Sequence, residues 1–324
     1  MEAFTGARAL SVPRRASERA APLEALARRC YPDMAVCVEE SDTGWLVRLA
    51  PVAELTRVQD SGIAAALAAT GIGFEDMMGW HRLLDLGQVV WLESMYHSWA
   101  LLAWSQVWRV HRDARPWLVH VAPHDDFGVP ALLGGESTGS LLAIMEDFAV
   151  DLADPRSVRG AIERGLIGVG SYITPWLRAH PSDVVHLAPS VPVAVGTTFR
   201  FGIEVETPGV ASRLVLRERA DGPCSYRRTK DPASLADGWT RRQPVLLDID
   251  LGYFDMLSTR QRDPLASPCS MTDLIGGLRA VAPSITAVTV SYAPGVCPAE
   301  RWAPLAADLR EALLALLESS PAVE

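Results

Sequence analysis

The chain has 324 residues, 49% hydrophobic and 21% charged, which is typical of a globular enzyme large enough to bury a full α/β core. Thirty Lys and Arg against 39 Asp and Glu give a net charge of −9, which argues against nucleic acid as a partner and suits a cationic substrate. Because no apolar run could span a bilayer and no signal peptide opens the sequence, we expect a cytoplasmic protein with no membrane partner.

The first 75 residues are predicted to form an N-terminal extension or a small appended module. Residues 1–30 are rich in Ala and Arg, which favours a flexible arm or a frayed helix, and their acidic residues argue against a targeting peptide. Residues 34–50 predict two short strands around a Ser-Asp-Thr-Gly turn, and residues 52–69 predict a helix. Residues 76–324 are predicted to form one α/β domain.

This domain alternates between strand and helix patterns. Residues 89–110 contain no Gly or Pro and place apolar residues at helical spacing, so we expect a mostly buried helix. The further expected elements are a strand at 116–123, a helix at 140–152, a loop and helix at 165–180, a strand at 183–190, a hairpin at 197–219, a strand at 244–254, a helix at 271–281, a strand at 285–292 and a helix from Ala303 to Leu317. This order implies a mainly parallel sheet with helices on both faces and an inserted β-hairpin.

Two carboxylates on one strand face give the first indication of a site. In PVLLDIDLGYF, Asp248 and Asp250 share a face because side chains alternate along a strand. Two acids on an otherwise apolar strand are costly to bury without a cation or several hydrogen-bond donors. Donation by loop amides or an arginine is the alternative. We favour a metal, since a bound cation commonly compensates clustered carboxylates.

A second strand ends in Ala122-Pro123-His124-Asp125-Asp126. The carboxyl ends of parallel strands meet at one edge of the sheet, where ligands bind in open α/β folds. We therefore expect His124 and Asp126 near the Asp248 strand end. His120 points toward the same edge or is a hydrogen-bonded core histidine, and the sequence leaves both alternatives open.

The third element of the predicted site is the helix at 89–110. Glu93 and His97 are four residues apart and would share one face of it. The alternative is a solvated pair, but the surrounding tryptophans favour burial. Imidazole and carboxylate ligands suit Mn²⁺, Fe²⁺ or Zn²⁺, and an excess of carboxylates favours Mn²⁺. The five cysteines form no Cys-x-x-Cys pair, which argues against a thiolate site.

Five stretches carry a resemblance to a known family: HSWALLAW, WLVHVAPHDD, IGVGSYITPWL, LLDIDLGYF and VTVSYAPG. In this order they resemble the arginase/ureohydrolase superfamily, and within it the arginase-like branch that includes peptide arginases of ribosomal peptide biosynthesis. The resemblance covers about residues 90–298 and implies an arginase-like three-layer fold. It also implies an arginine-containing peptide as substrate, which would be hydrolysed to ornithine and urea.

The resemblance further implies a ligand set. His97 and Asp126 would bind one metal, His124 and Asp250 would bind the other, and Asp248 would bridge both. The implied cofactor is Mn²⁺, as one or two ions.

One departure from the family pattern affects this ligand set. The second bridging aspartate falls on Ala122, and paired ions need shared ligands to lie about 3.5–4 Å apart. The two-metal state should weaken unless Asp125 or His120 replaces the missing acid, so these two residues join Glu93 as catalytic candidates. A one-metal centre could instead hold Fe²⁺ and oxidise a peptide side chain. A third alternative is a non-catalytic peptide-binding homologue.

Overall fold

The computed structural model describes residues 8–13, 20–31, 34–51, 60–111, 114–134, 140–143, 145, 147–190, 198–206, 213–218, 222–241, 243–255 and 268–320. Its main feature is a nine-stranded sheet in the order β12-β11-β13-β10-β6-β14-β15-β5-β4. The strands are β4 (His81–Asp85), β5 (Val90–Ser94), β6 (Trp117–Val121), β10 (Asp183–Leu187), β11 (Thr198–Glu206), β12 (Arg213–Glu218), β13 (Cys224–Thr229), β14 (Val245–Asp250) and β15 (Ile285–Ser291).

The sheet is mixed but mostly parallel. The six strands from β13 to β5 run parallel to one another. The hairpin β11–β12 adds to one edge and β4 to the other, both antiparallel. The prediction of an α/β fold with a mainly parallel sheet and an inserted hairpin is therefore confirmed.

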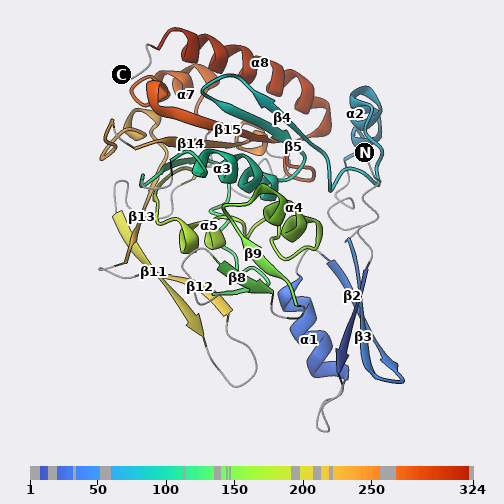
Figure 1. Cartoon of the computed structure of the whole chain (residues 1–324). Coiled ribbons are helices and arrows are strands. Elements are labelled where there is room, and N and C mark those ends of the chain that lie inside the picture. The colour runs from blue at the N-terminus through green and yellow to red at the C-terminus, as the bar shows by residue number, and fades with distance from the viewer. Residues whose placement is uncertain are drawn as a thin grey trace.

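Helices cover both faces of this sheet (Figure 1). On one face lie α7 (Met271–Leu278) and α8 (Ala299–Glu318), which bury Val119 and Leu247. On the other face lie α3 (Ala100–Trp108), α4 (Pro155–Glu163) and α5 (Ile173–Ala179), which bury Leu118 and Leu246. Because side chains alternate along a strand, His120 and Asp248 face the α3–α5 side.

The last helix shows how the sequence pattern produces this packing. Along α8, buried residues recur every three or four positions, at Trp302, Leu305, Leu309, Leu313 and Leu316. This spacing places them on one stripe of the helix, which packs against the sheet. The predicted C-terminal helix is confirmed and begins four residues earlier than expected. In the part of the chain that the structure describes, no helix is long and apolar enough to cross a membrane.

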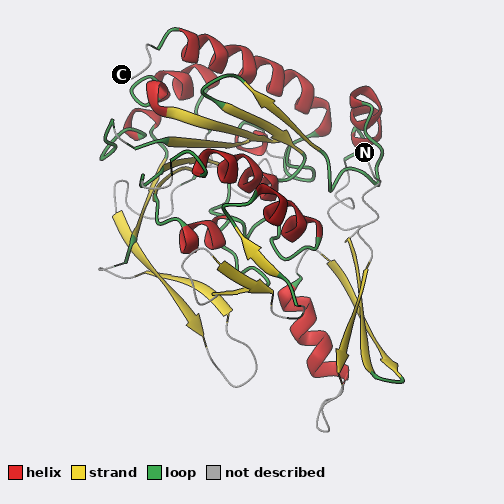
Figure 2. Cartoon of the chain, in the orientation of Figure 1, coloured by secondary structure: helices red, strands yellow, loops and turns green. Residues whose placement is uncertain are grey.

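The described residues also form two smaller antiparallel sheets (Figure 2). The first has the order β1-β3-β2 and contains β1 (Arg8–Pro13), β2 (Met34–Ser41) and β3 (Gly44–Pro51), beside α1 (Ala20–Cys30). The two predicted strands at 34–50 are confirmed. The prediction of an arm or frayed helix is wrong for residues 8–13, which pair with β3. Val36 and Leu49 belong to the same buried cluster as α3–α5.

The helix predicted at 52–69 is confirmed in part. Residues 52–59 lie outside the described residues, and the described helix is α2 (Ile63–Thr70), which contacts α8. Its C-terminal residue is followed by Gly71, whose φ of 70° ends the helix in the left-handed conformation that glycine adopts without strain.

The second small sheet corrects the helix predicted at 140–152. It contains β7 (Leu132–Gly134), β8 (Ser140–Ala143) and β9 (Ala149–Asp151), in the order β7-β8-β9. Along β8, Leu141 and Ala143 are buried and Leu142 is exposed, which is the alternation of a strand. The apolar run was too short to distinguish a helix from paired strands.

The single helix predicted at 89–110 is confirmed only in its second part, which is α3. Its first part is β5, which pairs with β15 on one side and β4 on the other. A short 3₁₀ helix, η2 (His97–Trp99), follows and leads into α3. Trp91 and Leu92 are buried on opposite faces of the sheet, so this strand is apolar on both sides and resembles a buried helix in sequence.

Candidate functional site

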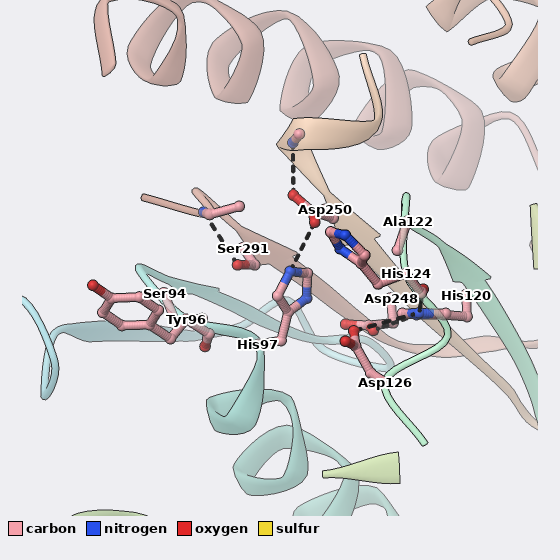
Figure 3. Close-up of polar contacts among 12 residues, drawn as sticks. Ser94, Tyr96, His97, His120, Ala122, His124, Asp126, Asp248, Asp250 and Ser291 are labelled. Atoms are coloured by element: carbon pink, nitrogen blue, oxygen red, sulfur yellow. Dashed lines mark hydrogen bonds and ion pairs between the residues drawn. The ribbon is translucent and has the colours of Figure 1, made fainter. Parts of the chain in front are cut away.

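The structure brings five of the predicted site residues together at the carboxyl end of the parallel strands. β14 ends in Asp248 and Asp250, and it lies between β6 and β15. His120 is on β6 and Asp126 follows this strand, while His97 begins η2 directly after β5. Their side chains point toward one another (Figure 3). All five are buried, with Asp126 the most exposed at 8%.

Asp248 lies at the centre of this cluster. One of its carboxylate oxygens contacts His120 Nδ1 at 2.9 Å and accepts a hydrogen bond from the Tyr172 hydroxyl at 2.6 Å. The other oxygen accepts from the Thr289 hydroxyl at 2.5 Å. Hydrogen bonds to a charged acceptor are shorter and stronger than neutral ones, so these donors stabilise a carboxylate that is 1% exposed.

Asp250 has a separate set of donors. Its Oδ2 lies 3.0 Å from His97 Nε2, and its Oδ1 accepts a hydrogen bond of 2.6 Å from the Gly252 amide. The second contact caps η4 (Leu251–Tyr253), where an aspartate satisfies an amide that has no partner within the helix. The chain therefore fixes Asp250 through its own backbone.

Two groups in the cluster are poorly satisfied. Among the residues that the structure describes, none forms a hydrogen bond with His97 Nδ1, although this atom is buried. Within the described part of the chain, the polar contacts of Asp126 are long, at 3.3 Å from the Tyr172 hydroxyl and 3.6 Å from His120 Nε2. Its φ of 55° lies in the left-handed region, which few residues other than glycine adopt and which aspartate tolerates better than most. A buried imidazole nitrogen without a partner, once it has lost its proton, and a weakly held carboxylate are groups that a cation would satisfy.

His120 has acceptors at both ring nitrogens. Nδ1 faces Asp248 and Nε2 lies 2.9 Å from the His124 carbonyl oxygen. Since a carbonyl only accepts, Nε2 carries a proton, and the contact with Asp248 then requires a second proton on either partner. The ring thus ties β6, β14 and the Asp126 turn together.

The charges of the cluster shift its pKa values in opposite directions. Burial opposes protonation of His97, but the nearby carboxylates, led by Asp250, outweigh it and raise the pKa to about 9. For His120 burial is likewise outweighed, mainly by Asp248, and the pKa is raised. Burial raises the pKa of Asp126, whereas the pKa of Asp248 is lowered because His120 outweighs burial. The carboxylates therefore favour the protonated imidazoles, and His120 in turn favours the charged form of Asp248.

Two other predicted residues, His124 and Asp125, lie at the surface. Both are exposed, and the His124 backbone carbonyl contacts the cluster through His120. The Asp125 carboxylate accepts from the Phe127 amide at 3.3 Å. Neither Asp125 nor His120 therefore lies free to replace the acid that is absent at Ala122.

Glu93 is not in the cluster. On β5 it shares a face with Trp91, on the α8 side of the sheet. Its carboxylate pairs with Arg82 at 2.7 Å and with Arg310 of α8. The expectation that Glu93 and His97 share a helix face is wrong because Glu93 lies on strand β5 and His97 on the 3₁₀ helix after it. Period-2 alternation along β5 turns Glu93 away from the cluster.

The arrangement has no ready-made metal cage. In the part of the chain that the structure describes, no three or more His, Cys, Asp or Glu side chains are grouped so that they could hold a metal ion. The physical reason is that imidazoles and carboxylates contact one another instead of converging on a common point. Metal binding would therefore have to displace the shared protons, and the donor types, nitrogen and carboxylate oxygen, suit Mn²⁺ or Fe²⁺.

Sequence reasoning missed Thr289, Tyr172 and His186, which contact this site. Tyr172 precedes α5 and gave no signal of its own. His186 on β10 is the sheet neighbour of His120; its Nε2 donates to the Ala122 carbonyl and its Nδ1 accepts from the Tyr226 hydroxyl. The similar strands WLVHV and DVVHL, each with His at the fourth position, could have indicated this pairing.

The fold and the site define the chain as an α/β protein with a buried histidine and carboxylate cluster at the carboxyl edge of a mostly parallel sheet. Compared with known proteins, the chain matches no family model and no curated sequence. The case for a particular function therefore depends on the site itself and on the sequence resemblance.

Proposed function

We propose that the chain is a metal-dependent hydrolase of the arginase type, which acts on the guanidino group of an arginine within a peptide. The observation that supports this most is the pair of unsatisfied groups, His97 Nδ1 and Asp126, inside a buried cluster with two further carboxylates. Three buried carboxylates are costly unless cations or several donors compensate them. His97, Asp126, Asp248 and Asp250 would hold the metal.

The same geometry favours one ion over two. Ala122 provides no bridging oxygen, Asp125 is exposed, and His120 is held by Asp248 and a carbonyl. Two dications need shared ligands to lie about 3.5–4 Å apart. We therefore propose a single Mn²⁺ per chain, with His124 available at the exposed rim.

Each part of the site has a chemical task in this proposal. When bound, such a metal would supply hydroxide by lowering the pKa of a bound water from 15.7 toward neutral pH. His120 and Thr289 orient the Asp248 carboxylate. The acidic chain, with a net charge of −9, attracts a cationic arginine side chain.

Metal analysis combined with urea release tests the proposal. The purified chain is loaded with Mn²⁺, its metal content is measured by mass spectrometry, and an arginine-containing peptide is assayed for urea and ornithine. We expect one Mn²⁺ per chain and urea release, both lost in Asp248→Asn. Asp237→Asn, at a carboxylate that is 70% exposed, is the matched control and should retain both. Unchanged metal content in Asp248→Asn would contradict the ligand assignment.

The lack of a bridging carboxylate at Ala122 supports a second candidate function. A centre with histidines, carboxylates and open positions is also the type that holds Fe²⁺ in oxygenases. One Fe²⁺ per chain, with O₂ uptake and an oxidised peptide instead of urea, would favour this alternative. A chain that binds peptide but takes up no metal would be the non-catalytic homologue.

A further inference from the structure

Tyr172 places a phenol oxygen between two carboxylates of the cluster. Its hydroxyl lies 2.6 Å from Asp248 Oδ2 and 3.3 Å from Asp126 Oδ2. The ring is fully buried and stacks on His97, with ring centroids 5.8 Å apart and an interplanar angle of 15°. Trp104 also packs against this ring, tilted, at a centroid distance of 5.7 Å. The phenol thus lies among the proposed metal ligands His97, Asp126 and Asp248.

The backbone around Tyr172 holds this position firmly. Tyr172 is the residue before α5, in a turn where the Ser171 hydroxyl accepts from the Gly168 amide at 3.0 Å. The turn is joined to the Asp126 segment by the hydrogen bond from the Gly128 amide to the Gly170 carbonyl, at 2.9 Å. A Cβ on Gly128 would lie 2.5 Å from that carbonyl oxygen, so glycine is required for the close approach of the two turns.

The number of protons on the Tyr172 hydroxyl limits the hydrogen bonds that its oxygen can donate. The Tyr172 hydroxyl has one proton, and the short contact indicates that it is donated in the hydrogen bond to Asp248. The contact between the phenol oxygen and Asp126 Oδ2 is then between two acceptors, unless a further proton or a cation lies near both. Asp126 is the same carboxylate that lacks close donors elsewhere in the cluster.

We propose that Tyr172 is an oxygen ligand of the metal, together with Asp126 and Asp248, and supplies the donor that Ala122 lacks. This inference rests on the proposed metal site. The phenol gives its proton to solvent as its oxygen joins the metal, just as other protein ligands lose their protons on coordination. No oxidation or reduction is involved. The inference assigns the chain a ligand set of carboxylates, imidazole and phenolate.

Iron provides a probe that depends on the ligand and not on turnover. Fe²⁺ is bound anaerobically and oxidised in air, after which iron content and the visible spectrum are recorded. A phenolate bound to Fe³⁺ gives a charge-transfer absorption band in the visible range, with tyrosinate vibrations in resonance Raman spectra. We expect this band in the wild-type chain, its loss in Tyr172→Phe, and its retention in Tyr253→Phe, whose hydroxyl accepts from the Cys269 amide. Tyr172→Phe should also weaken Mn²⁺ binding by about tenfold or more.

The wild-type spectrum alone can overturn the inference, so it does not depend on whether Tyr172→Phe folds. Bound iron with no phenolate band would exclude Tyr172 as a ligand and leave the metal site intact. A band that persists in a folded Tyr172→Phe chain would assign the ligand to another tyrosine. Failure to bind iron or Mn²⁺ at all would overturn the metal site and this inference together.

Discussion

Glu93→Gln distinguishes a structural role for this residue from a role in the site. The Glu93 side chain is 1% exposed, pairs with Arg82 and Arg310, and accepts from Trp91 Nε1 at 3.0 Å. Removing one partner of a buried ion pair costs about 3–5 kcal/mol. Because the arginine side chains are 47% and 33% exposed and can reach water, we expect the lower end, about 3 kcal/mol.

Thermal unfolding followed by circular dichroism measures this effect. A loss of about 3 kcal/mol corresponds to a fall in Tm of about 6–12 °C in a domain of this size, while metal content should stay unchanged. Glu39→Gln is the matched control, since Glu39 forms an exposed pair with Arg48 at 2.9 Å and should cost about 1 kcal/mol or less. A Glu93→Gln chain that keeps its Tm but loses metal would refute the reasoning and place Glu93 in the site.

Three further predictions test other features of the structure. His180 is 4% exposed and burial lowers its pKa to about 4, so the neutral ring contributes stability that is fully present above pH 6.5 and is lost as pH falls toward 4. Urea unfolding of the wild-type chain should show a loss of about 3 kcal/mol over this pH range, and His180→Phe should remove that loss. The same pH dependence in both chains would contradict the prediction. Ala122→Asp should raise Mn²⁺ from one to two ions per chain, and constant stoichiometry would show that position 122 does not face the metal. Gly277→Ala should destabilise the fold by about 1–3 kcal/mol because its Cβ would overlap the Pro232 carbonyl. Gly276→Ala is the control and should be neutral or stabilising, since a Cβ there meets no atom within 4 Å. Equal effects in the two variants would be inconsistent with this packing.

Much of the fold follows from patterns that act locally. β14 and β15 are apolar runs of strand length, and α8 has a clear apolar stripe, so all three were predicted. β5 was not, because it is buried on both faces, so its apolar residues do not alternate with polar ones. Trp91 and Leu92 fit a helical pattern equally well, and pairing with β15 and β4 makes this segment a strand.

The candidate site was predictable to the extent that it depends on strand direction. Alternation placed Asp248 and Asp250 on one face, and parallel strands brought Asp126 to the same edge. The predicted position of Glu93 was wrong because Glu93 lies on strand β5 and not on the predicted helix. Tyr172 reaches the cluster through a turn packed against another turn, a tertiary contact that no local pattern in the sequence encodes.

A Mn²⁺ position determined by anomalous X-ray diffraction tests the central claim most directly. Crystals grown with Mn²⁺ should show one anomalous peak at the carboxyl end of β14, within about 2.0–2.3 Å of a His97 nitrogen and of Asp126 and Asp248 oxygens. The Tyr172–Asp248 contact should lengthen as the metal replaces the phenol proton. An ordered cluster that retains this contact at 2.6 Å, with no peak beside it, would contradict the account.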